Sequence, residues 1–195
     1  MRALTLTLAL GAFLLSPTIR AEAPATMSVR DALGSFFPGS QRVTYRKIGL
    51  SPEDQERISQ RLGYRFTAAE VTVYVALTGE KIDGYAVVDE EMGQHLPITF
   101  GVKISPSGTV ERSEILCYRE TYGAAVREER FNQQFAGKSA TDPLRPGSDI
   151  VIVSGATISS HAVAKGVKRA LVTVDELVLH KRSAERASPK TRGGS

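Results

Sequence analysis

The residues best suited to chemistry are small and polar, and they lie where an apolar run gives way to a long helix-like segment. Ser154-Gly155-Ala156-Thr157 follows the apolar run 151–153 and precedes Ile158, Ser159 and Ser160. A phosphate at such a helix start would meet free backbone N–H groups and the positive end of the helix dipole. The small Gly155 and Ala156 would let a ligand approach the backbone, and one of the hydroxyl groups could be esterified.

The same residues have a second interpretation, which physical chemistry alone leaves open. A Ser or Thr at a helix start often acts only as a cap, accepting hydrogen bonds from the helix's own backbone N–H groups. The segment lacks the lysine and the glycine spacing of a phosphate-binding P-loop. It also lacks the Gly-x-Ser-x-Gly pattern of hydrolases, so nothing marks Ser154 as a nucleophile. We therefore predict no catalytic residue here.

An antiparallel sheet is predicted upstream of this segment. From Glu70 onward the sequence alternates in polarity or runs through β-branched residues, as strands do. Turn residues at 78–81 and 106–108 separate neighbouring runs. The predicted strands are 71–75, 84–88, 98–104 and 110–118, with an earlier one at 43–48.

Helices are predicted before and after these strands in the sequence. The first covers Ser28–Phe36, and the second begins at the cap Ser51 and ends at Gly63. After the sheet we expect a helix at 125–136, a short strand at 149–153 and a long helix at 158–179. The long helix has an apolar stripe made by Val163, Val167, Leu171, Val174 and Val178. The predicted fold class is α+β: an antiparallel sheet of four or five strands, packed by a long C-terminal helix and shorter helices.

The two ends of the chain have compositions unlike the middle. Residues 1–23 have a charged start, an apolar run and small residues around Ala23, which is typical of a signal peptide. We expect one domain at 24–182 and a disordered basic tail at 183–195. The protein is therefore predicted to be exported to the periplasm or another extracytoplasmic space. If the leader were not cleaved, it would tether the protein to the membrane.

Composition excludes several other classes of function. Cys117 is the only cysteine, so no internal disulfide can form, and its apolar surroundings predict a buried strand residue. The chain has no Trp and no basic stripe interleaved with aromatic residues, so a nucleic-acid partner is not expected. The three histidines are scattered at 95, 161 and 180 and lack the spacing of metal ligands.

Three segments together resemble one protein family. Ser-Gly-Ala-Thr at 154–157, followed by Ile-Ser-Ser, resembles the flavinylation motif of the FMN-binding domain family, known from the C subunit of the sodium-translocating NADH:quinone reductase and the G subunit of the Rnf complex. The segment 118–123, Tyr-Arg-Glu-Thr-Tyr-Gly, is similar to the family's His-x-Glu-Thr-Pro-Gly. The segment 131–138 resembles its Phe-x-x-Gln-Phe-x-Gly-Lys stretch.

The resemblance implies a cofactor and a way of attaching it. In the family, a flavin transferase joins FMN to the last Thr of the motif through a phosphoester, and the matching residue is Thr157. Its expected phosphate cradle comprises Ser154, Gly155, Ala156, Ile158 and Ser159, and Glu120 and Thr121 are expected near the ring or the ribityl chain. Phe131 and Phe135, four residues apart, are expected in the core rather than beside the flavin.

The expected function is transfer of electrons by bound FMN, in contact with a membrane-bound or extracytoplasmic redox partner protein. Two alternatives remain: a reductase that binds FMN noncovalently, and a flavin-free exported adaptor or sensory module of the same fold. Val151 favours these alternatives, because family members commonly carry Asp at that position. The replacement of the family's His and Pro by Tyr118 and Tyr122 also changes the expected surroundings of the ring.

Overall fold

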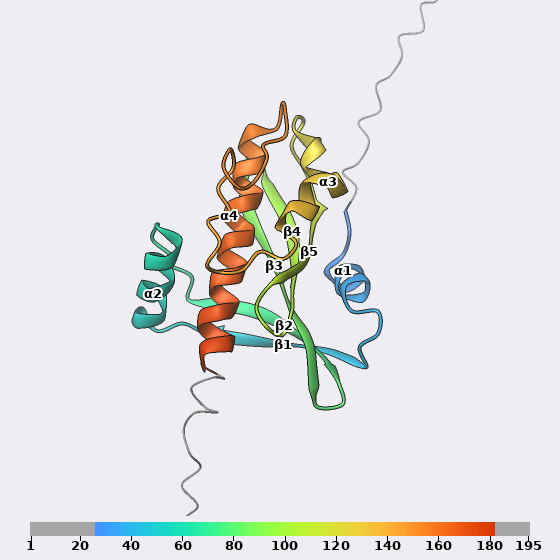
Figure 1. Ribbon diagram of the computed structural model, residues 1–195, viewed down its shortest axis with the longest axis vertical. Helices are drawn as coiled ribbons and strands as arrows, with labels where there is room; N and C mark the ends of the chain where they lie inside the picture. Colours follow the sequence, from blue (N-terminus) through green and yellow to red (C-terminus); the bar gives the residue numbers. More distant parts are fainter. Residues whose placement is uncertain (1–25, 182–195) are drawn as a thin grey trace, which may run out of the picture.

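The core of the fold is a five-stranded antiparallel sheet in which neighbours in sequence are neighbours in space (Figure 1). The structure is a computed structural model, and it describes residues 26–181. Short turns connect β2 to β3 and β4 to β5, so the sheet after Glu70 is a meander, as the sequence predicts. The strands are β1 (Arg42–Gly49), β2 (Glu70–Thr78), β3 (Lys81–Met92), β4 (Pro97–Ile104) and β5 (Val110–Cys117).

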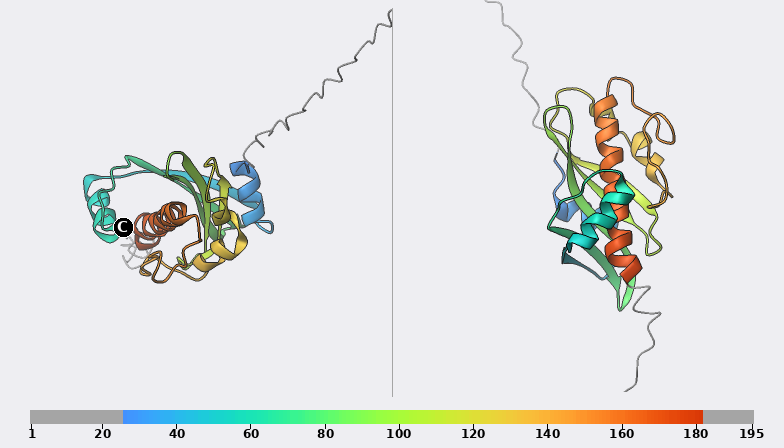
Figure 2. Two further views of the ribbon diagram at one scale, coloured as in Figure 1. Left: turned by 90° about the horizontal axis from the view of Figure 1, so that it is seen from above. Right: turned by 90° about the vertical axis from the view of Figure 1, so that its left-hand side faces the viewer.

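Helices cover both faces of this sheet. The sheet curls around α4 (Thr157–Val174), and α1 (Val29–Phe36) lies on the opposite side (Figure 2). A π-helical turn, Asp175–Leu179, continues α4, and α2 (Pro52–Leu62) packs beside it. The predicted α+β class, including the long C-terminal helix, is confirmed.

Local residues determine both ends of α2. Ser51 Oγ accepts a hydrogen bond from Asp54 N, and Asp54 in turn accepts one from Ser51 N, so the first turn is capped in both directions. Gly63 ends the helix in the left-handed conformation, at φ 74°. Arg61 then pairs with Asp175 and Glu176, which ties α2 to the end of α4.

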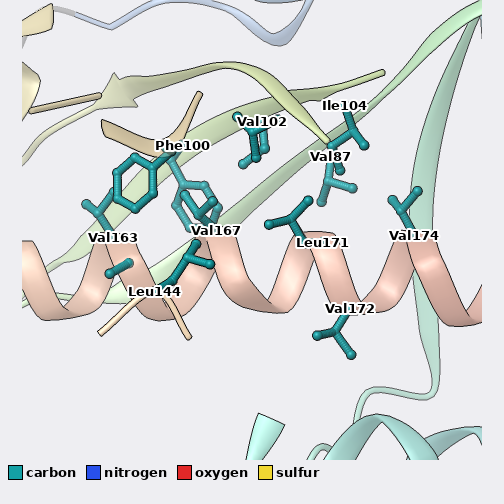
Figure 3. Close-up of a cluster of buried hydrophobic side chains, with 14 of the residues drawn as sticks. Val87, Phe100, Val102, Ile104, Leu144, Val163, Val167, Leu171, Val172 and Val174 are labelled. Carbon is teal, nitrogen blue, oxygen red and sulfur yellow. The ribbon is translucent and has the colours of Figure 1, made fainter. Parts of the chain in front are cut away.

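The main core lies between α4 and the inner face of the sheet (Figure 3). The predicted stripe is buried along its whole length, from Val163 to Val178. Gly166 allows the closest approach, because a Cβ there would lie 2.3 Å from the ring of Phe100. The helix is thus held firmly against β3 and β4, and truncating a buried residue such as Leu171 to Ala should cost roughly 2–5 kcal/mol.

A smaller core holds α1 on the outer face of the sheet. Phe36 and Phe37 pack there against Ala76 and Ala86. Gly101 of β4 makes room for this helix, since a Cβ on it would lie 3.1 Å from the Phe36 ring. Cys117, at the end of β5, is a free and buried cysteine, as the sequence predicts.

We predicted one continuous helix at 125–136, and this prediction is wrong. The structure has three short turns there, η1 (Ala124–Arg127), α3 (Glu129–Asn132) and η2 (Gln133–Phe135). Glu128 separates η1 from α3 because its backbone is extended, at φ −62° and ψ 140°. Buried Asn132 stabilises the break by donating hydrogen bonds to the carbonyl oxygens of Val126 and Glu128.

The prediction of a strand at 149–153 is also wrong. Only an isolated bridge, between Pro146 and Ile150, occurs in this segment. Ile150 is buried, but the Val151 side chain is 73% exposed, so the apolar run does not enter the sheet. The backbone hydrogen bonds of Val151 go instead to the side chain of Gln134.

The predicted leader at 1–23 and the predicted tail at 183–195 lie outside the described residues. Within residues 26–181, no helix combines the length and the hydropathy needed to cross a bilayer.

Candidate functional site

The Ser154-Gly155-Ala156-Thr157 segment forms a tight turn that leads directly into α4. Ala156 N donates to the carbonyl oxygen of Val153 at 3.0 Å, and Gly155 takes the left-handed conformation, at φ 74°. Left-handed backbone favours glycine, which explains the residue type at that position. Thr157 is then the first residue of the helix.

Within residues 26–181, no side chain caps this helix start. Ala156 occupies the cap position, and its methyl group offers no acceptor atom to the first-turn N–H groups. The interpretation of this segment as an ordinary Ser or Thr cap therefore does not hold. An anion bound at this helix start would meet the N–H groups of the first turn and the positive end of an 18-residue helix.

The predicted cradle residues divide between the surface and the interior. Ser154, Gly155, Thr157 and Ile158 are exposed, so the Thr157 hydroxyl is accessible to a transferase or a ligand. Ala156 and Ser159, by contrast, are 4% and 5% exposed. The predicted set is thus brought together in one turn, but part of it supports the turn from beneath.

Ser160 stabilises the turn from inside. Its hydroxyl oxygen accepts a hydrogen bond from Val153 N at 3.2 Å and donates one to the carbonyl oxygen of Ala156 at 2.9 Å. This buried hydroxyl joins Val153, the residue before the turn, to Ala156, the cap residue of the helix. Its burial and its two partners rule it out as an attachment point.

Tyr118, which directly follows β5, connects the second motif to α4. Its hydroxyl donates to the carbonyl oxygen of Tyr122 at 2.5 Å and lies 2.8 Å from Ser159 Oγ. A phenol has one proton, so Ser159 must be the donor in the second hydrogen bond. Burial raises the pKa of the Tyr118 hydroxyl above its ordinary value.

Gly123 brings the two motifs into direct contact. A Cβ on Gly123 would lie 2.7 Å from Tyr118 Oη, 3.0 Å from Ser159 Oγ and 3.3 Å from the Ala156 Cβ. Its φ of 86° also favours glycine. The last residue of the Tyr118–Gly123 motif therefore packs against the beginning of α4.

The third motif holds the segment that enters the turn. Gln134 binds the backbone of Val151 on both sides: its Oε1 accepts from Val151 N at 2.7 Å, and its Nε2 donates to the Val151 carbonyl at 3.3 Å. Lys138 of the same motif pairs with Asp149 at 3.3 Å. These contacts replace the sheet hydrogen bonds that a strand at 149–153 would have made.

Glu120 binds the neighbouring β3–β4 hairpin. Its carboxylate accepts hydrogen bonds from His95 N at 2.6 Å and Leu96 N at 3.0 Å. These two backbone donors hold the pKa of Glu120 below its usual value. The carboxylate is therefore engaged with the protein, whereas Thr121, the other polar residue predicted to be near the flavin, is exposed.

Three further residues lie near the site. Phe131 and Phe135 are 2% and 0% exposed and pack edge to face, with ring centroids 5.5 Å apart, so their expected place in the core is confirmed. His161 lies on α4 and is exposed. A groove of about 560 Å³ lies elsewhere, beside the C-terminal part of α4 near Tyr64 and Arg169, and none of the residues predicted to contact the flavin lines it.

Sequence reasoning did not select Gly123, Gln134 or Ser160 as site residues. Gly123 and Gln134 belong to the motifs at 118–123 and 131–138, and that membership is the signal by which they could have been found. Ser160 belongs to the Ile-Ser-Ser that follows the first motif, but its supporting role depends on the direction of a buried hydroxyl, which the sequence does not give.

The arrangement can bind a phosphate and present one hydroxyl for esterification. Uncapped N–H groups and the helix dipole favour an anion, the small residues leave the backbone open, and Thr157 supplies an accessible oxygen. Because a covalent link removes the need to enclose the ligand, the position of Thr157 on an open surface is compatible with a tethered cofactor.

Comparison with known proteins supports FMN as the ligand. Residues 93–172 match the family model of the FMN-binding domain, a stretch that contains all three motifs. The chain is similar to the G subunit of the proton-translocating ferredoxin:NAD(+) oxidoreductase complex of Clostridium ljungdahlii, with 37% identity over 52% of this chain. It is also similar to the G subunit of the Na(+)-translocating ferredoxin:NAD(+) oxidoreductase complex of Acetobacterium woodii, with 27% identity over 64% of this chain. The matched regions span 58% and 65% of these relatives' own lengths.

The fold has a solved counterpart. The crystal structure of Shewanella oneidensis NqrC matches with a TM-score of 0.53 and 14% sequence identity, covering 78% of this chain and 89% of that one. At this identity the likeness concerns the fold alone. The sheet with its long C-terminal helix is therefore an arrangement already seen in a solved protein.

Proposed function

We propose that this chain, which carries an FMN-binding domain at residues 93–172, is an exported electron carrier with FMN joined to Thr157 by a phosphoester. The main observation behind the proposal is that three motifs, separate in sequence, meet at one helix start that has no side-chain cap. Tyr118 and Gly123 contact its first turn, and Gln134 fixes the segment that enters it.

The residues of the site fit the cofactor that the family model implies. Thr157 is the exposed hydroxyl at the helix start, and Ser154 and Gly155 are the exposed residues of the turn. The free N–H groups of the first turn would neutralise part of the phosphate charge. FMN supplies the redox chemistry when bound, and the protein fixes its position.

The chain's own residues would keep the attachment point rigid. Ser160, Ser159 and Tyr118 form hydrogen bonds beneath Thr157, and all three are buried. Ala156, the cap residue, is packed against Gly123. A rigid anchor limits the number of positions that a tethered ring can take, which favours transfer to a partner that docks in one orientation.

The partner in this proposal is another redox protein. The matched relatives are subunits of oxidoreductase complexes, and we propose that this chain likewise exchanges electrons with a membrane-bound or extracytoplasmic protein. A flavin transferase would supply the FMN. Export follows from the proposed signal peptide at 1–23, and retention of that segment would leave a membrane tether.

The exposure of Val151 keeps noncovalent FMN as a second candidate. This side chain lies three residues before Ser154 and is 73% exposed, so a modifying enzyme would reach it. If the enzyme requires a carboxylate there, FMN would be held only by the helix start. A flavin-free adaptor is the third interpretation, and it predicts a colourless protein.

The state of the chromophore separates these three functions. The full chain should be produced through its export route in a host with a flavin transferase, and then denatured. Yellow colour that stays with the denatured chain supports the proposed carrier, colour that is released supports noncovalent FMN, and a colourless protein supports the adaptor. For a carrier, chemical reduction should bleach the bound flavin and a redox protein acceptor should restore the colour, without consumption of a small organic substrate.

A further inference from the structure

Exposed apolar side chains lie beside Thr157 in the chain and on two segments that are joined to its helix start. Val151 and Ile158 flank the turn and are 73% and 49% exposed. Leu96 is 43% exposed on the β3–β4 hairpin, which Glu120 joins to the end of β5. Tyr122 is the most exposed of them, at 80%. Single exposed apolar side chains are common on protein surfaces, whereas several on neighbouring segments mark a surface that binds a ligand or a partner.

Tyr122 combines a fixed backbone with an exposed ring. Its carbonyl oxygen accepts the hydrogen bond from Tyr118, and the next residue, Gly123, packs against Ala156 and Ser159. The backbone of Tyr122 is therefore held beside the first turn of α4. The side chain, by contrast, is in solvent, where the face of its ring is open to a flat ligand.

We propose that Tyr122 is a positioning residue for the flavin, and that its phenol ring stacks on the isoalloxazine ring of FMN held at Thr157. The inference rests on the proposed function. Two flat aromatic systems prefer offset stacked arrangements, and the energy of such pairs favours the stacked state roughly two- to tenfold. The Tyr side chain has only two rotatable bonds, so little conformational freedom is lost when the ring is covered.

Stacking on a phenol has a spectroscopic signature that does not depend on activity. The excited flavin takes one electron from the adjacent phenol and returns it on recombination, so emission is lost with no net reaction. A flavin stacked on Tyr122 should therefore fluoresce weakly. An asymmetric contact with the ring should also give circular dichroism in the visible flavin bands.

The experiment compares flavin-loaded wild type with Tyr122→Leu and Tyr122→Phe. Flavin fluorescence per bound FMN should rise roughly two- to tenfold in Tyr122→Leu, where both the ring and the electron donor are lost. Tyr122→Phe should also fluoresce more strongly but keep the visible circular dichroism, because a ring that is hard to oxidise remains in place. Tyr45→Leu is the matched control, since Tyr45 is 60% exposed on β1 and its ring lies beside Tyr74 of β2 instead.

The outcomes are distinguishable from failure of the proposed function. FMN bound to wild type, with fluorescence unchanged in Tyr122→Leu, would overturn this inference and leave the carrier proposal standing. An equal rise in Tyr45→Leu would overturn it as well. Wild-type protein without FMN would overturn both proposals. Loss of folding is not expected from these changes because the Tyr122 ring is exposed, and the far-ultraviolet circular dichroism of each variant checks this.

Discussion

The hydroxyl groups of Tyr118 and Ser159 lie 2.8 Å apart, although 41 residues separate them in sequence. Tyr118 follows the last residue of β5, and Ser159 belongs to the first turn of α4. This buried hydrogen bond joins two motifs that are distant along the chain. The candidate site is therefore a three-dimensional unit, and its parts should fail together when this connection is broken.

Removing the Tyr118 hydroxyl should weaken the fold at the site. Tyr118→Phe loses the hydrogen bonds to the Tyr122 carbonyl and to Ser159, and it leaves the buried Ser159 hydroxyl without this acceptor. The free energy of unfolding should fall by about 1–3 kcal/mol, as measured by urea denaturation. Tyr45→Phe, at a 60% exposed position, should change it by less than about 0.5 kcal/mol. Equal stability of the two variants would contradict the assigned hydrogen bonds.

A side chain at Gly123 should separate the two motifs. Gly123→Ala suffers both a left-handed φ of 86° and contact at 2.7 Å with Tyr118 Oη. Gly137→Ala is the matched control, because its φ of 79° is similar but no atom lies within 4 Å of the added Cβ. The control should lose about 1–2 kcal/mol of stability, and Gly123→Ala should lose a further 1–3 kcal/mol, roughly the cost of overpacking. If the two variants unfold at the same urea concentration, the close contact between Gly123 and Tyr118 is contradicted.

Glu120 should make stability depend on pH in the acid range. Hydrogen bonds from Leu96 N and His95 N lower its pKa in the folded protein below the ordinary value of 4.5. A lowered pKa means that the stabilisation is fully present above the unfolded-state value and is lost as pH falls through the folded-state value. Stability of wild type should therefore decline below pH 4.5 more steeply than that of Glu120→Gln.

The control for this acid dependence is Glu80→Gln, because Glu80 is exposed in the turn between β2 and β3. Its stability profile should follow that of wild type from neutral pH down to the acid transition. A Glu120→Gln profile that also follows wild type would mean that the carboxylate does not hold the hairpin. Chemical denaturation at a series of pH values provides the measurement.

Restoring a carboxylate before the turn should raise the extent of flavin attachment. Val151 is bound through its backbone to Gln134, and its side chain is 73% exposed, so Val151→Asp should change stability by less than about 0.5 kcal/mol. If the transferase reads a carboxylate at this position, the variant should carry more FMN per chain than wild type after equal exposure to the enzyme. An unchanged ratio of flavin to protein absorbance would show that Val151 does not limit attachment.

Much of the fold was predictable because its signals are local. The cap at Ser51, the acidic first turn and Gly63 specify α2 within the helix itself. The strands from Glu70 to Cys117 follow one another through short turns, so pairing needs no information from distant residues. The same holds for α4, whose apolar stripe alone indicates a face packed on the sheet.

The errors arose where a specific side-chain hydrogen bond decides the local backbone. The apolar residues before the turn resemble a strand, but Gln134 takes the backbone hydrogen bonds of Val151. The helix expected at 125–136 is interrupted at Glu128, next to the hydrogen bonds of buried Asn132. Neither interaction can be read from periodicity. The candidate site was selected through motif resemblance and stays a prediction, whereas the support by Ser160 and Gly123 could be found only in the structure.

The most direct test of the central claim is the intact mass of the protein, made in a host that possesses the flavin transferase. Wild type, Thr157→Ala, Thr157→Ser and Thr121→Ala should be compared after denaturation. We predict the added mass of one FMN, less water, on wild type and on Thr121→Ala, with none on Thr157→Ala. Thr157→Ser tests whether a hydroxyl alone suffices. An FMN adduct that persists in Thr157→Ala, or no adduct on wild type, would contradict covalent attachment at Thr157.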